Sequence, residues 1–371
     1  MSASRAELDA AVIAWAREPD WRDDEARFDS LARALFAHQF AHCAPYRRFC
    51  EGRDVDPDRL TDWRLIPPVP TGAFKEVALR AFPEAGTQHV FRTSGTSTDA
   101  RGALHLDTLA VYEASLEASF RRHLLPDVAP GDRIEMHALA PATHEAPDSS
   151  LSHMFDTMLA RAGAPESSHW VVDGELDIAH ARRTLGRLAA SERPVLLGGT
   201  AFAFVHLLEA LDAIDERFPL PAGTRVMETG GFKGRSRSVT RDDLHAWIER
   251  RLGVPPSRIV NQYGMTELGS QFYDAVLRDP TAPRRKTLPP WTRVRCIEPG
   301  RDSHRANDVA LGEVGRLVVY DLANTGSVLA VETADLGRWH DGGFEVLGRE
   351  PGAEERGCSI ALDAMLGEAR A

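Results

Sequence analysis

The sequence predicts an α/β protein whose central sheet is mostly parallel. Short apolar runs alternate with longer helical patterns through residues 133–260, which is typical of strands that are covered by helices on both faces. Segments rich in glycine and hydroxyl groups follow three of these predicted strands. From Gly312 onward, short alternating strands are separated by turns, which predicts a small antiparallel sheet or barrel.

Residues 6–49 predict helices that cap or support this core. Leu8, Val12 and Trp15 share one helical stripe. A second stripe consists of Phe28, Leu31, Leu35, Phe36 and Phe40. Pro45 ends the second pattern. Cys43 and Cys50 lie beside aromatic residues, where a buried structural thiol is favoured.

The core elements follow in a regular order. Strands are expected at residues 133–139, 195–197, 225–228 and 259–260, and helices at residues 152–161, 202–211 and 242–251. A polar connector over residues 278–305 is expected to be rich in loops. The last strands are expected at residues 315–320, 327–333 and 343–347. Ligands of parallel sheets bind at the carboxyl ends of the strands, so the residues that follow each strand are candidates for a site.

Length and composition bound the possible functions. The 371 residues suffice for two domains, or for one large α/β domain with an appendage. A net charge of -11 argues against a nucleic-acid or anionic-membrane partner. The first residues resemble neither a signal nor a transit peptide, and no window is as apolar as a membrane span. Four cysteines without CxxC spacing favour a reducing, cytoplasmic location.

The stretch FRTSGTSTDARG, residues 91–102, has the composition of a phosphate-binding loop. Hydroxyls and unhindered backbone N–H groups, followed by an arginine, suit a polyphosphate. The stretch is not a Walker A loop, because no Gly-Lys-Ser/Thr follows at the required spacing. A surface turn is the alternative, and the two interpretations are about equally supported by these residues alone.

A second stretch, QYGMTELGSQ at residues 262–271, suits a nucleotide and its cation. Gly264, after an aromatic residue, allows the backbone to turn tightly against a flat ligand. The hydroxyl of Thr266 and the carboxylate of Glu267 suit a phosphate and a divalent cation. The alternative is a helix N-cap with an acid in the first turn.

In chain order, the motifs TSGTS, GGFKG, YGMTE, ETADLG and GRE resemble those of the adenylate-forming superfamily of acyl-CoA synthetases, luciferases and peptide-synthetase adenylation domains. Within it, the chain resembles LuxE-type acyl-protein synthetases over nearly its whole length. This likeness depends on HQFAHCAPYRRFC, PPVPTGAFKE, YGMTELGSQFY and GAEERGCSIAL. The resemblance implies the adenylate-forming large-domain fold, with layered α/β subdomains and a small β-barrel. The expected ranges are a helical segment (1–85), a core whose barrel begins at about residue 285 (86–347) and a short remnant of the small C-terminal domain (348–371).

The resemblance implies a nucleotide site for ATP and magnesium. The β- and γ-phosphates would be held by Thr93, Ser94, Gly95, Thr96 and Ser97. The adenine would be bound by Gly230, Gly231, Phe232 and Tyr263. Thr266 would contact the α-phosphate and Glu267 the magnesium ion, while Asp335 and Arg349 would lie at the ribose. Considered alone, Asp335 is a turn acid and Arg349 a surface arginine.

The resemblance is weakest in the phosphate loop. Thr98 stands where the family usually has a glycine, and Arg101 at best replaces the usual lysine. An arginine can hold a phosphate, but its planar guanidinium is not equivalent to an ammonium group.

The resemblance also implies an acid-binding pocket. His153 lies about where the superfamily places an aromatic residue or histidine near the carboxylate, although a histidine satisfied within a helix explains it nearly as well. Gly199 and Phe202, in GGTAFAF, are expected to line the acyl pocket together with Gly264.

Cys358 is the candidate acyl acceptor. Superfamily members that load coenzyme A usually continue into a small mobile domain with a catalytic lysine, but the last lysine here is Lys286. Cys358 lies between Gly357 and Ser359 with Arg356 nearby, and positive charge favours the nucleophilic thiolate. LuxE-type proteins are similar in using a cysteine at this place. The alternative is a small packed residue on a terminal strand.

The expected function is therefore ATP-dependent activation of a carboxylic acid, for which a fatty acid is expected, to acyl-AMP. The acyl group would then move to Cys358 and on to a partner protein such as an acyl reductase. Two alternatives stay open: a ligase whose acceptor is coenzyme A, a carrier protein or an amine, and a non-catalytic subunit that binds nucleotide or acyl chains. Acid-dependent pyrophosphate exchange separates the last from the others.

Overall fold

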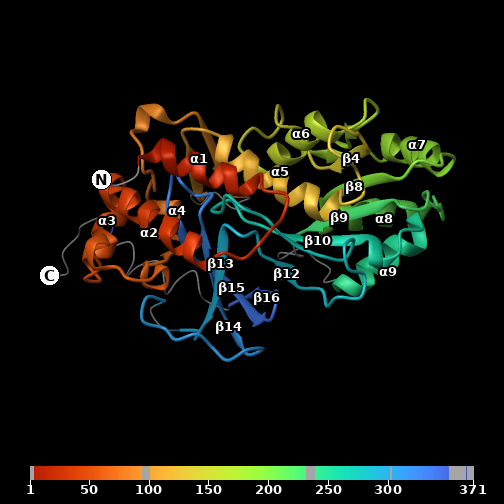
Figure 1. Ribbon diagram of the computed structural model, residues 1–371. Coiled ribbons are helices and arrows are strands. Elements are labelled where there is room, and N and C mark those ends of the chain that lie inside the picture. The colour runs from red at the N-terminus through yellow and green to blue at the C-terminus, as the bar shows by residue number, and fades with distance from the viewer. Residues whose placement is uncertain (1–3, 94–100, 231–238, 301–302, 351–364, 366–371) are drawn as a thin grey trace. The chain divides into compact units, whose positions relative to one another are not determined.

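The computed structural model describes residues 4–93, 101–230, 239–300, 303–350 and 365 (Figure 1). Contacts within the chain define two compact units. The first comprises Met1–Ala118, Met265–Gln271 and Thr287–Ala371, and the second comprises Ser119–Gly264 and Phe272–Lys286. The two units interleave along the sequence, whereas the ranges expected from the sequence are consecutive.

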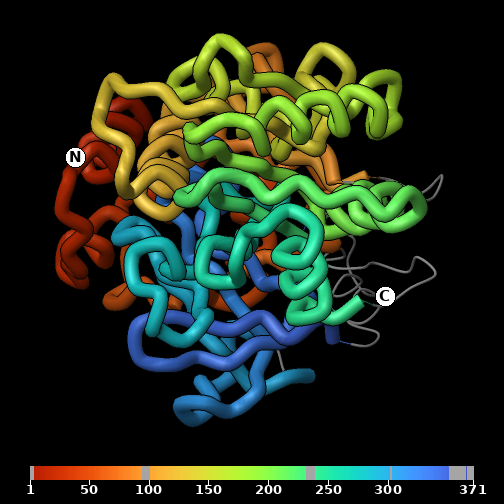
Figure 2. The backbone as a smooth tube through the Cα atoms, turned by 90° about the vertical axis from the view of Figure 1, so that its right-hand side faces the viewer, coloured from red at the N-terminus to blue at the C-terminus, as the bar shows by residue number. Residues whose placement is uncertain are grey.

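The first unit begins with three helices, and each packs against the next one along the chain (Figure 2). They are α1 (Arg5–Ala16), α2 (Glu25–His42) and α3 (Ala44–Glu51), followed by the short α4 (Ala73–Glu76). Ser4 and Glu7 form a capping box at the start of α1. Pro45 lies in the first turn of α3, where its missing N–H costs no helical bond. The predicted N-terminal helices are thus confirmed.

Cys43 and Cys50, at the two ends of this third helix, are fully buried and free. Burial raises the pKa of the Cys43 thiol to about 11 and raises that of Cys50 further. Both thiols therefore stay protonated at neutral pH, which confirms the prediction of structural rather than reactive cysteines.

The strands of the first unit form an antiparallel sheet in the order β13-β14-β15-β16. Their bounds are Thr292–Ile297, Val314–Asp321, Ala330–His340 and Gly343–Arg349. The short β1 (Val69–Pro70) pairs with β15, and β2 (His89–Arg92) forms a hairpin with β3 (Ala103–Leu106). The antiparallel sheet expected after Gly312 is confirmed.

Most of the described residues of the connector over residues 278–305 lie outside helices and strands, as expected, but the connector also contains the short β12 (Lys286–Thr287) and β13. Thr292, Val294 and Cys296 are buried, while the residues between them are less so. This alternation is the signature of a half-buried strand, but the arginines and prolines around it mask the pattern in the sequence.

The second unit is a mostly parallel sheet in the order β11-β10-β9-β8-β4-β5, in which β11 alone of these described strands is antiparallel to its neighbour. The main parallel strands are β4 (Glu135–Leu139), β8 (Val195–Thr200), β9 (Arg225–Thr229) and β10 (Ile259–Tyr263). The remaining strands are β5 (Ser168–His169), β6 (Val171–Val172), β7 (Glu175–Leu176), β11 (Phe272–Asp274) and β12 (Lys286–Thr287). The predicted parallel α/β core is confirmed.

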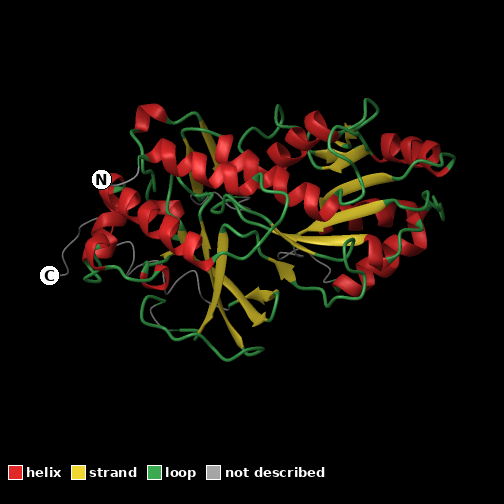
Figure 3. Cartoon of the chain, in the orientation of Figure 1, coloured by secondary structure: helices red, strands yellow, loops and turns green. Residues whose placement is uncertain are grey.

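Helices cover both faces of this sheet (Figure 3). They are α6 (Ser150–Ala162), α7 (Ile178–Ala189), α8 (Ala201–Ala213) and α9 (Arg241–Leu252). The helix α5 (Ala110–Leu124) precedes them in the chain. Short 3-10 turns occupy Pro57–Arg59, Trp63–Leu65 and Glu84–Gly86 in the first unit and Pro256–Arg258 in the second. The inward sides of α7, α8 and α9 share one apolar cluster with Val195, Leu197 and Val226. Phe155 of α6 instead packs on Gly198, which points to the other face. None of the helices described for this chain has the length and apolar character needed to cross a membrane.

His123→Phe is expected to make the protein less sensitive to acid. His123 is buried, stacks on Tyr273 and donates Nδ1–H to the Ser119 carbonyl at 2.8 Å. Burial lowers the pKa of His123 from 6.5 to about 3. The unfolded chain thus binds a proton that the native chain does not, and stability is lost as the pH falls below 6.5. By pH 5 this amounts to about 2 kcal/mol.

Urea unfolding of the variant at pH 7 and pH 5 measures this effect. The variant should lose less stability between the two values than the parent. His206→Gln is the control, because His206 is an exposed histidine of α8. This variant should lose as much stability between the two pH values as the parent does. Equal losses in the parent and in His123→Phe would contradict the assignment.

Candidate functional site

In the second unit, β8, β9 and β10 are adjacent parallel strands (Figure 1). Candidate residues lie at or directly after their carboxyl ends, as expected. Thr200 follows Gly199 in β8 and caps α8, accepting a hydrogen bond from the Ala203 N–H at 3.1 Å. Gly230 follows β9 with φ of 79°, and none of the described residues lies within 4 Å of the place where its Cβ would be. Tyr263 ends β10, and its ring lies 6.2 Å from that of Phe272. A flat ligand at this edge would meet glycine backbone and an aromatic face.

The acyl-pocket candidates in this unit have different surroundings. A Cβ on Gly199 would lie 2.7 Å from the Leu139 Cβ, so close packing of two strands requires glycine there. Phe202 is 45% exposed on the first turn of α8. His153 is half-buried on α6, and Gly264 is exposed. The packing requirement explains Gly199 on its own, and the pocket role of all four residues stays a prediction.

In the first unit, the base of the predicted phosphate loop is a closed hairpin. The Thr93 N–H donates to the Gly102 carbonyl at 2.9 Å, and the Gly102 N–H donates to Thr93 Oγ1 at 3.0 Å. Arg101 donates from Nε to the Thr93 carbonyl at 2.6 Å. Part of the Arg101 guanidinium therefore fixes the hairpin itself. The predicted residues Ser94, Gly95, Thr96 and Ser97 lie outside the described residues, as do Thr98, Gly231, Phe232 and Cys358.

Glu267 lies beside this hairpin base. A Cβ on Gly102 would lie 3.5 Å from Glu267 Oε1 and 3.5 Å from Thr93 Oγ1. Two motifs that are far apart in sequence thus place a carboxylate and a hydroxyl near one buried glycine. Glu267 itself is 7% exposed, and Thr266, next to it, is half-buried.

A carboxylate beside a phosphate loop has the chemistry that suits magnesium. Mg²⁺ is commonly held by one or two carboxylates together with water and substrate phosphates, rather than by a cage of protein ligands. Among the described residues there is no cluster of three or more His, Cys, Asp or Glu that could hold a metal ion. Glu267 would hold the ion, and Thr93 would contact the triphosphate beside it.

Asp335 and Arg349 are direct neighbours across β15 and β16. In an antiparallel pair, opposite residues point to the same face. The Asp335 N–H donates to Thr333 Oγ1 at 3.1 Å, and this hydrogen bond fixes the backbone of Asp335. The structure thus brings together the two residues that the resemblance assigns to one ribose, and that role stays a prediction.

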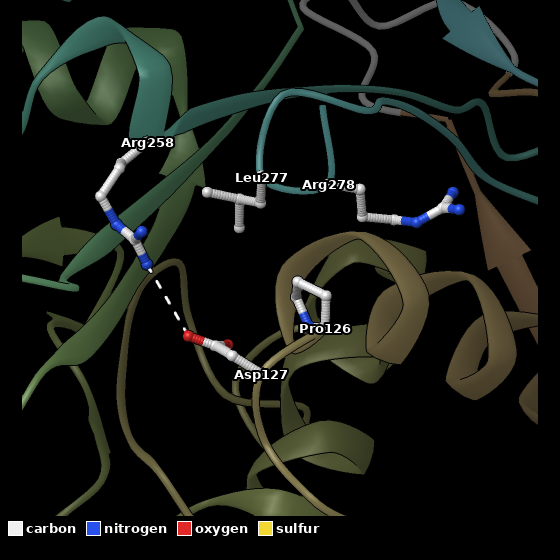
Figure 4. Close-up of a pocket in the computed structure, with 5 residues that line it drawn as sticks. All are labelled: Pro126, Asp127, Arg258, Leu277 and Arg278. Carbon is white, nitrogen blue, oxygen red and sulfur yellow. Dashed lines mark ion pairs between the residues drawn. The ribbon is translucent and has the colours of Figure 1, made fainter. Parts of the chain in front are cut away.

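The second unit has a cavity of about 500 Å³ (Figure 4). Its lining consists of Pro126, Asp127, Arg258, Leu277 and Arg278. Arg258 points toward Asp127, at 3.9 Å, and the buried Arg225 also pairs with this carboxylate (Figure 4). Arg225 begins β9 and Arg258 precedes β10, so the cavity lies at the amino ends of the strands. It is at the edge opposite to the candidate nucleotide residues of this unit.

Comparisons with known proteins agree with the motifs. Residues 3–367 match the family model described as "Acyl-protein synthetase, LuxE". A long-chain-fatty-acid–luciferin-component ligase from Photorhabdus luminescens is 37% identical over 67 residues, which cover 18% of this chain and 57% of that protein. The chain therefore matches little more than half the length of this curated relative.

The fold is similar to that of a solved acyl-CoA ligase. An open conformation of 2-hydroxyisobutyryl-CoA ligase in complex with 2-HIB-AMP and CoA has a TM-score of 0.61 at 16% identity, covering 87% of this chain and 75% of that chain. A long-chain-fatty-acid-CoA ligase from Archaeoglobus fulgidus has a TM-score of 0.48 at 13% identity, covering 77% and 54%. The first likeness confirms the predicted adenylate-forming fold.

Proposed function

The chain belongs to the LuxE family of acyl-protein synthetases, and from this premise we propose that it activates a carboxylic acid with ATP and transfers the acyl group to Cys358. The observation that carries the proposal is the position of Glu267 beside Thr93, at the base of the phosphate loop. A fatty acid is the proposed substrate class, since the curated relative is named a long-chain-fatty-acid ligase.

In the first step a carboxylate oxygen of the acid attacks the α-phosphorus of ATP, and pyrophosphate leaves. Both reactants are anions, so the protein must align them and neutralise charge. Thr93 and Glu267 would hold the phosphate end, with Thr266 at the α-phosphate. Bound magnesium would neutralise the charge on the leaving pyrophosphate. No general base is needed, because the acid reacts in its ionised form.

The adenosine would be bound by residues of the motifs that the resemblance assigns to the adenine and the ribose. Gly230 leaves room for the adenine, and the Tyr263 ring would stack on it. The Asp335 carboxylate would accept hydrogen bonds from the ribose hydroxyls, with Arg349 beside it. These contacts bind and orient the nucleotide but do not react.

In the second step the Cys358 thiolate attacks the carbonyl carbon of acyl-AMP. A carbon–sulfur bond forms, the bond to the phosphate oxygen breaks, and AMP leaves with the electron pair. Arg356, which is close to Cys358 in the sequence, would favour the thiolate. The thioester is then available to a partner protein, for which an acyl reductase is the proposed class.

Acid-dependent exchange of labelled pyrophosphate into ATP tests the first step. With magnesium present, exchange should require an added acid and be fastest with a long-chain fatty acid among a series of aliphatic and aromatic acids. ATP binding without exchange for any acid would overturn the proposal in favour of a non-catalytic nucleotide-binding subunit.

A further inference from the structure

The turn that carries Thr266 and Glu267 is held by a distant corner of the same unit. Residues 265–271 contain no helix or strand, so their backbone polar groups need partners elsewhere. The Glu267 carbonyl accepts a hydrogen bond from Asn324 Nδ2 at 2.8 Å. The Ser270 N–H and Oγ–H both donate to the Asp321 carboxylate, each at 2.7 Å.

This corner, residues 321–329 between β14 and β15, is itself fixed by buried polar contacts. The Ala323 N–H donates to the Asp321 carboxylate at 2.9 Å. Gln39 of α2 donates to the Asn324 carbonyl at 2.8 Å and accepts from the Leu329 N–H at 2.9 Å. Burial raises the pKa of Asp321 to about 6, which leaves it ionised, and a strong acceptor, at neutral pH.

Close packing supports the same arrangement. A Cβ on Gly269 would lie 2.8 Å from the Ala323 carbonyl carbon, so glycine lets the turn lie directly on the corner. The Trp291 indole N–H donates to Ser270 Oγ at 3.0 Å and to Ser115 Oγ at 3.1 Å. The end of the turn is thus held from several sides.

Burying a carboxylate and an amide is costly unless their hydrogen bonds are made. The Asp321 side chain is 0% exposed and that of Asn324 is 2% exposed, and both form hydrogen bonds with residues of the turn. Apolar side chains could fill the same volume but would not fix the turn at Glu267 and Ser270. We propose that Asp321 and Asn324 are positioning residues, which hold Glu267 at the phosphate loop. This inference rests on the proposed adenylation and deepens it.

Asn324→Ala, measured by pyrophosphate exchange, tests the proposal. A shift of about 1 Å in a catalytic group can cost roughly 100-fold, so kcat should fall about 10- to 100-fold with little change in KM for the acid. The magnesium concentration for half-maximal exchange should rise several-fold. Ser327→Ala is the matched control: Ser327 is buried in the same corner, but its hydroxyl bonds the Leu79 carbonyl instead of the turn. Its exchange should stay within about twofold of the parent.

A double-mutant cycle separates positioning from general damage. If Asn324 acts through Glu267, adding Asn324→Ala to Glu267→Gln should cost little more activity. Full additivity, or equal losses in Asn324→Ala and Ser327→Ala, would overturn the inference while leaving the proposed function intact.

Failure of the proposed function has a different signature. The parent protein would then show no pyrophosphate exchange with any acid. In that case the positioning role is tested by the increase in melting temperature that magnesium and ATP produce in each variant. That stabilisation should be smaller in Asn324→Ala than in Ser327→Ala. Equal stabilisation in the two variants would overturn the positioning role as well.

Discussion

Replacing Cys358 with alanine is expected to abolish covalent acylation of the protein while acid-dependent pyrophosphate exchange continues at near the parental rate. The thiolate is proposed to act only after acyl-AMP has formed, so its loss should leave the first step unaffected. The measurement is incubation with labelled acid, ATP and magnesium, followed by denaturation and treatment with hydroxylamine. Labelling should be hydroxylamine-sensitive in the parent and absent in the variant.

Cys296→Ala is the matched control for this experiment. Its thiol is buried, donates to the Gly337 carbonyl at 3.3 Å, and has a pKa raised by burial. Labelling should therefore persist in Cys296→Ala. Labelling that also persists in Cys358→Ala would exclude the cysteine role, and turnover with added coenzyme A or an amine in that variant would support a ligase with a different acceptor.

Glu267→Gln is expected to lower the rate of acid-dependent exchange by about 100- to 1,000-fold, the effect typical of losing one preorganised group that stabilises charge in the transition state. The amide keeps the shape of the side chain but loses the negative charge that would hold magnesium at the phosphate loop. Exchange measured over a range of magnesium concentrations should show a higher requirement as well as a lower maximum.

Glu345→Gln is the control for Glu267→Gln. Glu345 is a half-buried acid of β16 that pairs with His340 at 3.5 Å. Its loss should change exchange by less than about twofold, because surface pairs contribute little. Parental exchange by Glu267→Gln at every magnesium concentration would contradict the role of Glu267 and remove the main structural support for the proposed site.

Local patterns predicted most elements of the core. The apolar runs before Gly198, Gly230 and Tyr263 are strands, because a buried parallel strand has the same composition wherever it occurs. β13 was missed, because Arg293 and Arg295 alternate with its buried residues in a segment that also contains prolines. This segment forms a strand because it pairs with β14, and its composition alone does not indicate that pairing.

The sequence by itself determined the class of fold, the family and the candidate motifs, because these depend on residue order and local periodicity. Only the tertiary structure decided which distant residues meet. Glu267 lies beside Thr93 and Gly102, and it is held by Asn324, 57 residues further along the chain. Such contacts depend on how the strands and corners are packed, and packing brings together residues whose separation in sequence carries no periodic signal.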